Sequence, residues 1–192
     1  MPSAHRPRDS ALIDALGKRP RITYDGPSWR VVRDGRDVLQ GSRAGGRWDD
    51  GTFDVLYTAL EADGAVAEMH FHLAKGQPVF PSKAKYRLHE LEVAIAKGIR
   101  FLAVKDLQEL GVSRDRYGKL GYGERQQEYR RTQEIAEAAH FLGCDGLIAP
   151  NARWECLNLV VFTDRSRPET LAARRAMGLV DWEAWTRRTG RN

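Results

Sequence analysis

The sequence of 192 residues lacks most of the features that assign a protein to a class at once. It holds only two cysteines, Cys144 and Cys156. Two thiols do not make a disulfide framework in a chain of this size, so we expect both to be reduced and structural. No apolar run approaches the ~20 residues that a membrane-spanning helix requires. The first residues are charged and interrupted by prolines, unlike a secretory signal, which favours a cytoplasmic protein.

Nucleotide-binding fingerprints are also missing, since the chain has neither a P-loop nor a GxGxxG motif. Lysine and arginine number 31 against 26 aspartates and glutamates, a net charge of +5. Arginine supplies most of the positive charge and suits bidentate phosphate contacts, so a phosphorylated small molecule, a nucleic acid or an acidic protein are the candidate partners. The arginines are spread along the chain, however, which makes a nucleic-acid binder the weakest of these readings.

What is present indicates an ordinary globular domain. Hydrophobic residues make up 42% of the chain and charged residues 30%. One domain of this length buries roughly 70% of the surface of its unfolded chain. Strand and helix patterns alternate without a regular βαβ rhythm, which predicts a single α+β domain. We expect residues 1–20 to be a short lead-in containing one or two helical turns, and residues 21–192 to form the domain.

Local patterns place the expected elements. Strands are expected at 52–58, 86–96, 101–107, 147–150 and 157–163, with strand or turn segments at 21–26 and 28–35. Helices are expected from Asp63, a plausible N-cap, to residue 73, and from 124 to Gly143, a good stop signal. Residues 34–50 and a proline-bounded segment from 77 read as loops, and the tail after residue 165 reads as one or two polar helices.

The stretch GGRW at 45–48 precedes the strand that ends near Tyr57. Two glycines let the backbone approach a ligand closely, and Arg47 carries a planar fork of donors suited to a diphosphate. Tyr57 offers an aromatic face on which a flat ring stacks. The simpler alternative is a surface arginine over a glycine turn, followed by a packing tyrosine.

Further polar residues stand where apolar ones are expected. Glu68 lies in an apolar helical segment, so it is either paired with a core-facing arginine or used by the protein. Asn151 and Arg153 directly follow a buried strand, where polar groups line clefts or form an ordinary turn. His70 and His72 diverge on a helix and have no third ligand at metal spacing, so we expect no metal site.

Taken together, these residues resemble the RES family of bacterial toxins. The resemblance covers residues 28–163 and places a RES domain over 21–192. It is carried by GGRW at 45–48, LYTAL at 56–60, Glu68, a helix containing Thr132 and Gln133, and GCDGLIAPNARW at 143–154 followed by NLVVF. The family has serine where this chain has Asn151, and an amide still offers both a donor and an acceptor there.

The resemblance implies a fold similar to ADP-ribosyltransferases, with central antiparallel or mixed sheets and flanking helices. It implies NAD as a consumed substrate and requires no metal. It also implies a partner, an Xre-like antitoxin that covers the active site and contacts DNA itself.

Breaking the bond between nicotinamide and ribose builds positive charge on the sugar, which a carboxylate stabilises. Glu68 is the candidate for that carboxylate. Arg47 is expected to hold the pyrophosphate or the adjoining ribose, and Tyr57 to stack on or orient the nicotinamide ring. Asn151 is expected to bind substrate or align Glu68, and Arg153 to assist or to support the loop.

The acceptor of the ADP-ribose group stays open. Transfer to a target protein is the favoured reading, because Asn151 departs from the NAD-degrading pattern. The alternative is an NAD glycohydrolase or phosphorylase that depletes cellular NAD. A second alternative is a non-catalytic binding module with a decayed site, against which the retention of Arg47, Tyr57 and Glu68 counts.

Overall fold

The computed structural model describes residues 8–74 and 85–191. Its strands are β1 (Ile22–Arg33), β2 (Val55–Ala59), β3 (Tyr86–Arg100), β4 (Gly146–Pro150), β5 (Leu157–Phe162) and β6 (Leu171–Leu179). Its helices are α1 (Ser10–Gly17), α2 (Ala62–Ala74), α3 (Val104–Gln108), α4 (Gln126–Phe141) and α5 (Trp182–Thr189), with one 3-10 turn, η1 (Pro168–Thr170). The proline-bounded loop expected from residue 77 lies largely outside the described residues.

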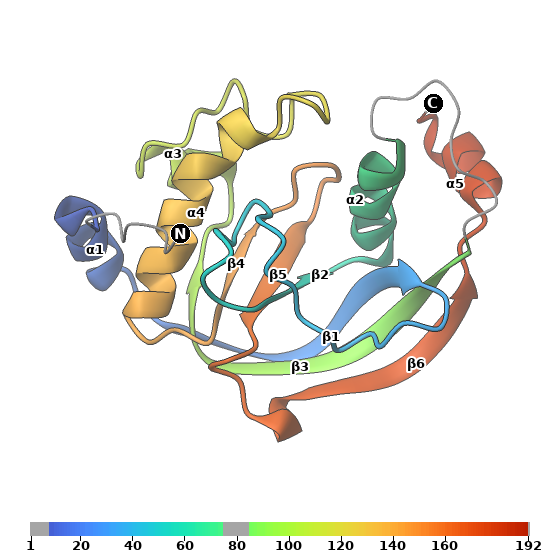
Figure 1. The fold of residues 1–192 in the computed structure, drawn as a ribbon, viewed down its shortest axis with the longest axis horizontal. Helices are drawn as coiled ribbons and strands as arrows, with labels where there is room; N and C mark the ends of the chain where they lie inside the picture. The colour runs from blue at the N-terminus through green and yellow to red at the C-terminus, as the bar shows by residue number, and fades with distance from the viewer. Residues whose placement is uncertain (1–7, 75–84, 192) are drawn as a thin grey trace, which may run out of the picture.

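The strands form one sheet that closes into a ring (Figure 1). β1 pairs with β2, β2 with β5, β5 with β4, β4 with β3, and β3 returns to β1. β6 extends the sheet by pairing with residues 87–93 of β3, on the edge opposite β1. Within the described chain every pair except β3–β4 is antiparallel. This mixed sheet with flanking helices confirms the predicted α+β class.

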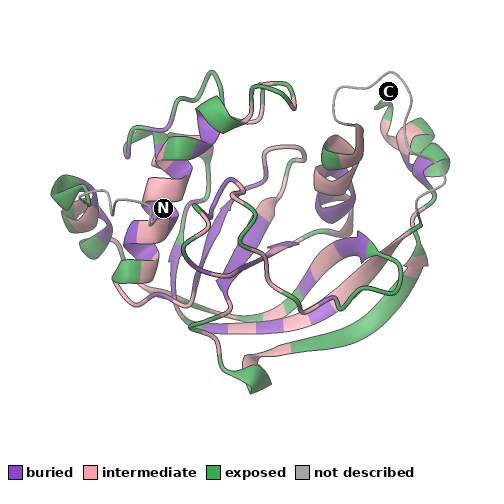
Figure 2. Cartoon of the chain, in the orientation of Figure 1, coloured by how far each residue is buried: buried purple, intermediate pink, exposed green. Residues whose placement is uncertain are grey.

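The central strands are buried on both faces (Figure 2). Successive side chains of a strand point to opposite faces of the sheet. Val160 and Phe162 therefore pack in the core that contains the buried faces of α1 and α4. Leu159 and Val161 pack in the second core, against residues of β1 and β3. Helix α4 lies against β4, while α2 lies against β1, β2 and β3, so the two helices flank the central strands.

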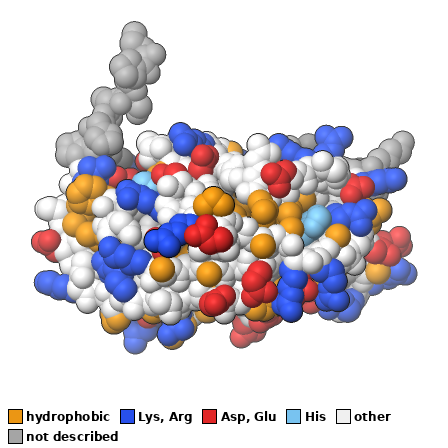
Figure 3. All heavy atoms as spheres, turned by 90° about the horizontal axis from the view of Figure 1, so that it is seen from below, with side chains coloured by type: hydrophobic (Ala, Val, Ile, Leu, Met, Phe, Trp, Pro, Cys, Tyr) orange, Lys and Arg blue, Asp and Glu red, His pale blue; other side chains and the backbone are white. Residues whose placement is uncertain are grey.

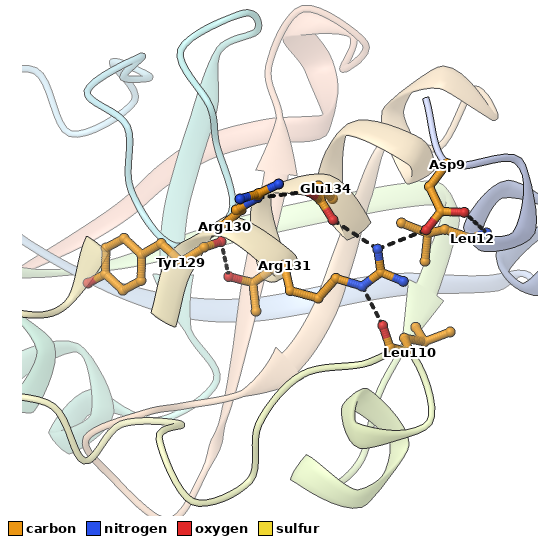
Figure 4. Close-up of polar contacts among 8 residues, drawn as sticks. Asp9, Leu12, Leu110, Tyr129, Arg130, Arg131 and Glu134 are labelled. Carbon is orange, nitrogen blue, oxygen red and sulfur yellow. Dashed lines mark hydrogen bonds and ion pairs between the residues drawn. The ribbon is translucent and has the colours of Figure 1, made fainter. Parts of the chain in front are cut away.

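Helix α1, which precedes the expected start of the domain, is part of the main core. Leu12 and Leu16 are buried there. Arg131 of α4 holds the helix in place by donating through Nη1 to Asp9, the residue that caps α1 (Figure 4). Its Nε donates to the carbonyl of Leu110, so one arginine joins α1 and the segment after α3 to α4.

Three sequence-based expectations about the elements are wrong. Residues 101–107 do not form a strand: α3 begins at Val104, because the carboxylate of Asp106 accepts hydrogen bonds from the N–H groups of Leu102 and Ala103 and closes a helical turn. The tail is not wholly helical either. Residues 171–179 form β6, because pairing with β3 outweighs the helix propensity of an alanine- and arginine-rich segment. Residues 22–33, expected as two segments, form one continuous strand.

The face formed by β3 and β6 mixes charges of both signs. Arg174 pairs with Glu90 and Glu92, and Arg175 with Glu90. Figure 3, which views the molecule from below, shows acidic and basic side chains interspersed on that face. A nucleic-acid backbone requires a basic stripe instead. Both cysteines are free thiols, and no helix of the described chain is long and apolar enough to cross a membrane.

If α1 belongs to the core, Leu16→Ala will lower the free energy of unfolding by about 2–5 kcal/mol, because it leaves a cavity among fully buried side chains. Urea denaturation measures this loss. Leu102→Ala is the matched control, since Leu102 is 62% exposed and its truncation leaves no cavity. Equal effects of the two substitutions would contradict the packing of α1 in the core.

Candidate active site

A cavity of about 680 Å³ lies between the loop after β1, strand β2 and helix α2. This volume is within the range of small-molecule sites. Arg47, Tyr57 and Glu68 all line the cavity, although they come from a loop, a strand and a helix. His72 and Asn158 line it as well, and the sequence did not mark Asn158. The structure thus brings together three of the five predicted site residues around one cavity.

One buried carboxylate organises the loop that carries Arg47. The two oxygens of Asp49 accept hydrogen bonds from the N–H groups of Gly45 and Gly46, each at 2.8 Å. The Tyr57 hydroxyl donates to Asp49 at 2.9 Å and accepts from the N–H of Trp48 at 2.9 Å. Gly45 has a φ of 73°, and a Cβ on Gly46 would lie 2.5 Å from the Tyr57 hydroxyl. Both positions therefore require glycine.

These bonds decide what Tyr57 presents to the cavity. Burial, and then the charge of Asp49, raise the pKa of Tyr57 well above its ordinary value. The hydroxyl is therefore neutral and committed to the loop. The ring is what remains for a ligand, and its expected stacking on nicotinamide stays a prediction.

Arg47 is buried, with its Nη1 donating to Oε1 of Glu128 on α4. Its guanidinium lies 4.5 Å from the ring centre of Tyr117 and 4.9 Å from that of Tyr129. Burial lowers the pKa of Arg47, but Tyr117, Glu128 and Glu68 outweigh this effect and raise it overall, so the charge persists. The simpler alternative for Arg47, a surface arginine over a glycine turn, is therefore wrong.

Helix α4 makes a second connection to the same loop. Nε2 of Gln133 donates to the carbonyl of Gly46 at 2.8 Å. The sequence identifies Gln133 only as part of the family motif and predicts no role for Glu128. A signal for Glu128 was present, since it is an acidic residue on the apolar stripe of α4, beside Tyr129. The same kind of signal singled out Glu68.

Glu68 differs from the other acids of the site because it has no hydrogen bond or ion pair to any residue that the structure describes. It is half-buried on α2. His72 follows one turn later, and burial lowers its pKa although Glu68 opposes this effect, so the imidazole is neutral at pH 7. The expected alternative for Glu68, an ion pair with a core-facing arginine, does not form with any arginine that the structure describes.

The last helix of the chain positions α2. The carboxylate of Asp63 accepts hydrogen bonds from Nε1 of Trp185 and Nη1 of Arg188, both at 3.0 Å. Asp63 lies in the first turn of α2 and is not its N-cap, contrary to the sequence-based expectation. Its carboxylate instead fastens α2 to α5, and so supports the helix that carries Glu68.

Asn151 and Arg153 are not among the residues that line the cavity. Oδ1 of Asn151 accepts hydrogen bonds from the N–H groups of Arg153 at 2.7 Å and Trp154 at 2.9 Å. Its Nδ2 donates to Oδ1 of Asn158 at 2.7 Å and to the carbonyl of Gly64 at 3.4 Å. A serine closes the same kind of turn, while the amide adds links to β5 and to the first turn of α2.

The two histidines of α2 diverge, as the sequence predicts. His72 lines the cavity, whereas the His70 ring lies 5.3 Å from that of Trp185. In the parts of the chain that the structure describes, no group of three or more His, Cys, Asp or Glu side chains is placed to hold a metal ion.

Removing the acceptor of Arg47 tests the buried pair. Glu128→Ala leaves a buried guanidinium without its partner, and we expect the free energy of unfolding to fall by about 3–5 kcal/mol. Glu109→Ala is the control, because Glu109 is the exposed partner of Arg19, and its loss is expected to cost at most about 1 kcal/mol. Chemical denaturation of both variants gives the comparison, and a small effect of Glu128→Ala would refute the structural weight assigned to the pair.

Comparison with known proteins agrees with the family resemblance. Residues 20–185 match the RES domain family. The chain is 26% identical over 178 residues to the NAD(+) phosphorylase MbcT of Mycobacterium bovis and of Mycobacterium tuberculosis, a match that covers 89% of this chain and 91% of each relative. It also superposes on the M. tuberculosis MbcT–MbcA toxin–antitoxin complex with a TM-score of 0.76, at 24% identity over 93% of this chain and 97% of that one.

These matches confirm the predicted resemblance and the mixed fold of sheet and helices. The finer likeness to ADP-ribosyltransferases stays a prediction. The matched region contains the glycine loop, Tyr57, Glu68 and the turn at Asn151. The protein is a member of the RES domain family.

Proposed function

We propose that this protein is an NAD-degrading enzyme, the toxin of a toxin–antitoxin pair, and that it breaks the bond between nicotinamide and ribose. The observation that carries the proposal is Glu68, an unpaired carboxylate on the wall of a cavity that Arg47 and Tyr57 also line. A half-buried charge without a partner is costly in a folded protein, which favours a role toward a ligand. The relatives named as NAD(+) phosphorylases support NAD as that ligand.

The chemistry fits the charges of the cavity. As neutral nicotinamide leaves, positive charge develops on the ribose, and the carboxylate of Glu68 stabilises it. Arg47 keeps its charge and has donors beyond the one that Glu128 accepts, so it holds the pyrophosphate or the adjoining ribose. The Tyr57 ring stacks on or orients the nicotinamide. Asn151 acts indirectly, by fixing the start of the helix that presents Glu68.

A small molecule is a better candidate than a protein side chain for the acceptor of the ADP-ribose group, so that the reaction degrades NAD. The sequence favoured transfer to a protein because Asn151 replaces the serine of the family. The amide of Asn151 is taken up by its own turn, by Asn158 and by Gly64, so the exchange gives no reason to assign a new acceptor. The name of the relatives points to phosphate as the acceptor. We therefore adopt the alternative, phosphorolysis of NAD, as the main reading.

A partner and a location belong to the same proposal. The similar M. tuberculosis structure is a toxin–antitoxin complex. We expect a small Xre-like antitoxin that covers the cavity and contacts DNA itself, and we place the activity in the cytoplasm. Co-expression of the neighbouring reading frame, followed by co-purification and loss of NAD consumption, tests this pairing.

The reaction is tested by incubating the purified protein with labelled NAD in three mixtures: buffer alone, buffer with inorganic phosphate, and cell lysate. Nicotinamide with ADP-ribose 1-phosphate, formed only with phosphate, is the expected result. Free ADP-ribose in all mixtures would indicate hydrolysis instead. A labelled protein band would restore transfer to a protein, and unchanged NAD in every mixture would favour a non-catalytic module.

Glu68→Gln keeps the shape of the side chain and removes its charge. We expect kcat for NAD consumption to fall by ~100-fold or more, because stabilisation of the developing charge on the ribose is lost. Glu61→Gln, an exposed acid just before the same helix, is the matched control and should keep the parental rate. NAD consumption by Glu68→Gln at the parental rate would show that the role assigned to Glu68 is wrong.

A further inference from the structure

One edge of the Arg153 guanidinium is buried without a hydrogen-bond partner among the described residues. Its Nη1 donates to the carbonyl of Gly118. Its Nε and Nη2 are inaccessible to solvent and unpaired. Buried polar groups in folded proteins are nearly always satisfied, so such a pair of donors needs an explanation. Nε and Nη2 form one side of the planar group, the side that binds two oxygens of a phosphate or carboxylate.

The orientation of that edge is fixed from several sides. Cζ of Arg153 lies 3.3 Å from the ring centre of Phe71. The N–H of Arg153 is held by Asn151, and its carbonyl accepts a hydrogen bond from Arg191. The backbone of Gly118 passes close to Ala152, because a Cβ on Gly118, whose φ is 73°, would lie 2.3 Å from the carbonyl oxygen of Ala152. The unpaired edge is therefore pre-organised before any ligand arrives.

The edge lies beside the carboxylate of the site. Phe71, on which the guanidinium stacks, is three residues after Glu68 on α2, so the two side chains share one helical face. Burial lowers the pKa of Arg153, and the charge of Glu68 opposes that effect, which agrees with this placement.

A second unpaired atom belongs to the other side chain that binds Gly118, the carboxylate of Glu128. Oε1 of Glu128 accepts a hydrogen bond from the N–H of Gly118 at 2.8 Å, but its Oε2 is buried and unpaired within the described chain. Glu128 thus flanks the same residue whose carbonyl accepts from Arg153. A ligand that complements both must accept hydrogen bonds from Arg153 and donate one to Glu128. A hydrogen phosphate ion does both, whereas the diester pyrophosphate of NAD has no O–H to donate.

We propose that Arg153, through Nε and Nη2, and Glu128, through Oε2, bind the inorganic phosphate that accepts the ADP-ribose group. This inference rests on the proposed phosphorolysis of NAD and adds the residues that select phosphate over water. One phosphate oxygen forms a bond to C1 of the ribose while the bond from C1 to the nicotinamide nitrogen breaks. The electron pair of the broken bond goes to that nitrogen, and the phosphate proton stays on the product, so no oxidant or reductant is needed.

The test varies phosphate and NAD separately in the full-length protein. For Arg153→Gln we expect the KM for phosphate to rise by ~10-fold or more, because two charge-assisted hydrogen bonds are lost. We also expect the product ratio to shift from ADP-ribose 1-phosphate toward ADP-ribose, with the KM for NAD unchanged. Arg153→Lys keeps the charge and loses the fork, so it should show the same shift in a variant whose folding is less disturbed.

Arg8→Gln is the matched control. Arg8 also lies over an aromatic ring, 4.3 Å from the centre of Phe141, but it does not line the cavity. It should leave both KM values unchanged. A binding readout independent of turnover completes the design: inorganic phosphate should raise the melting temperature of the parent and of Arg8→Gln, but not that of Arg153→Gln. Sulfate, which has no O–H for Glu128, should raise it less.

The outcomes separate the inference from the function on which it rests. A parent that consumes NAD at a rate independent of phosphate overturns the phosphorolysis and the phosphate site together. A phosphate-dependent parent with an unchanged KM for phosphate in Arg153→Gln overturns the site alone. If Arg153→Gln raises the KM for NAD but not the KM for phosphate, Arg153 binds NAD. That result would also overturn the proposed phosphate site.

Discussion

The buried ion pair between Arg47 and Glu128 is the interaction on which the geometry of the site depends. A guanidinium and a carboxylate taken out of water are stable only while each keeps its partner. The glycine loop therefore cannot move away from α4 without leaving two buried charges uncompensated. The hydrogen bond from Gln133 to Gly46 holds the glycine loop against α4 at a second point. Through these contacts, the packing of α4 against the sheet sets the position of one wall of the cavity.

The acids of the site divide into two kinds. Asp49 and Glu128 accept several hydrogen bonds each from the surrounding chain and so determine its shape. Glu68 accepts none from the described residues, and the neutral His72 beside it adds no cation. Its charge is therefore not compensated by a direct partner before substrate binds, as electrostatic stabilisation of a transition state requires. A fixed frame around one unpaired carboxylate is more informative about function than the fold itself.

The sequence was most predictive where local patterns decide the structure. Gly143 ends α4, the apolar segment of β5 is buried as expected, and the glycine pair marks a loop that only glycine can form. It failed where distant contacts decide. The β6 segment has helical composition but pairs with β3. The pairing of Arg47 with Glu128, 81 residues later, and the unpaired edge of Arg153 depend on tertiary placement that no local period encodes.

The attachment of α5 to Asp63 has a genetic consequence. A gene truncated after codon 181 still encodes every residue named here as lining the cavity, but it loses Trp185 and Arg188, which hold the helix that carries Glu68. Cells that escape the action of this protein should therefore carry stop codons and frameshifts as far along the gene as the codons of Trp185 and Arg188, well beyond the last codon of a cavity residue.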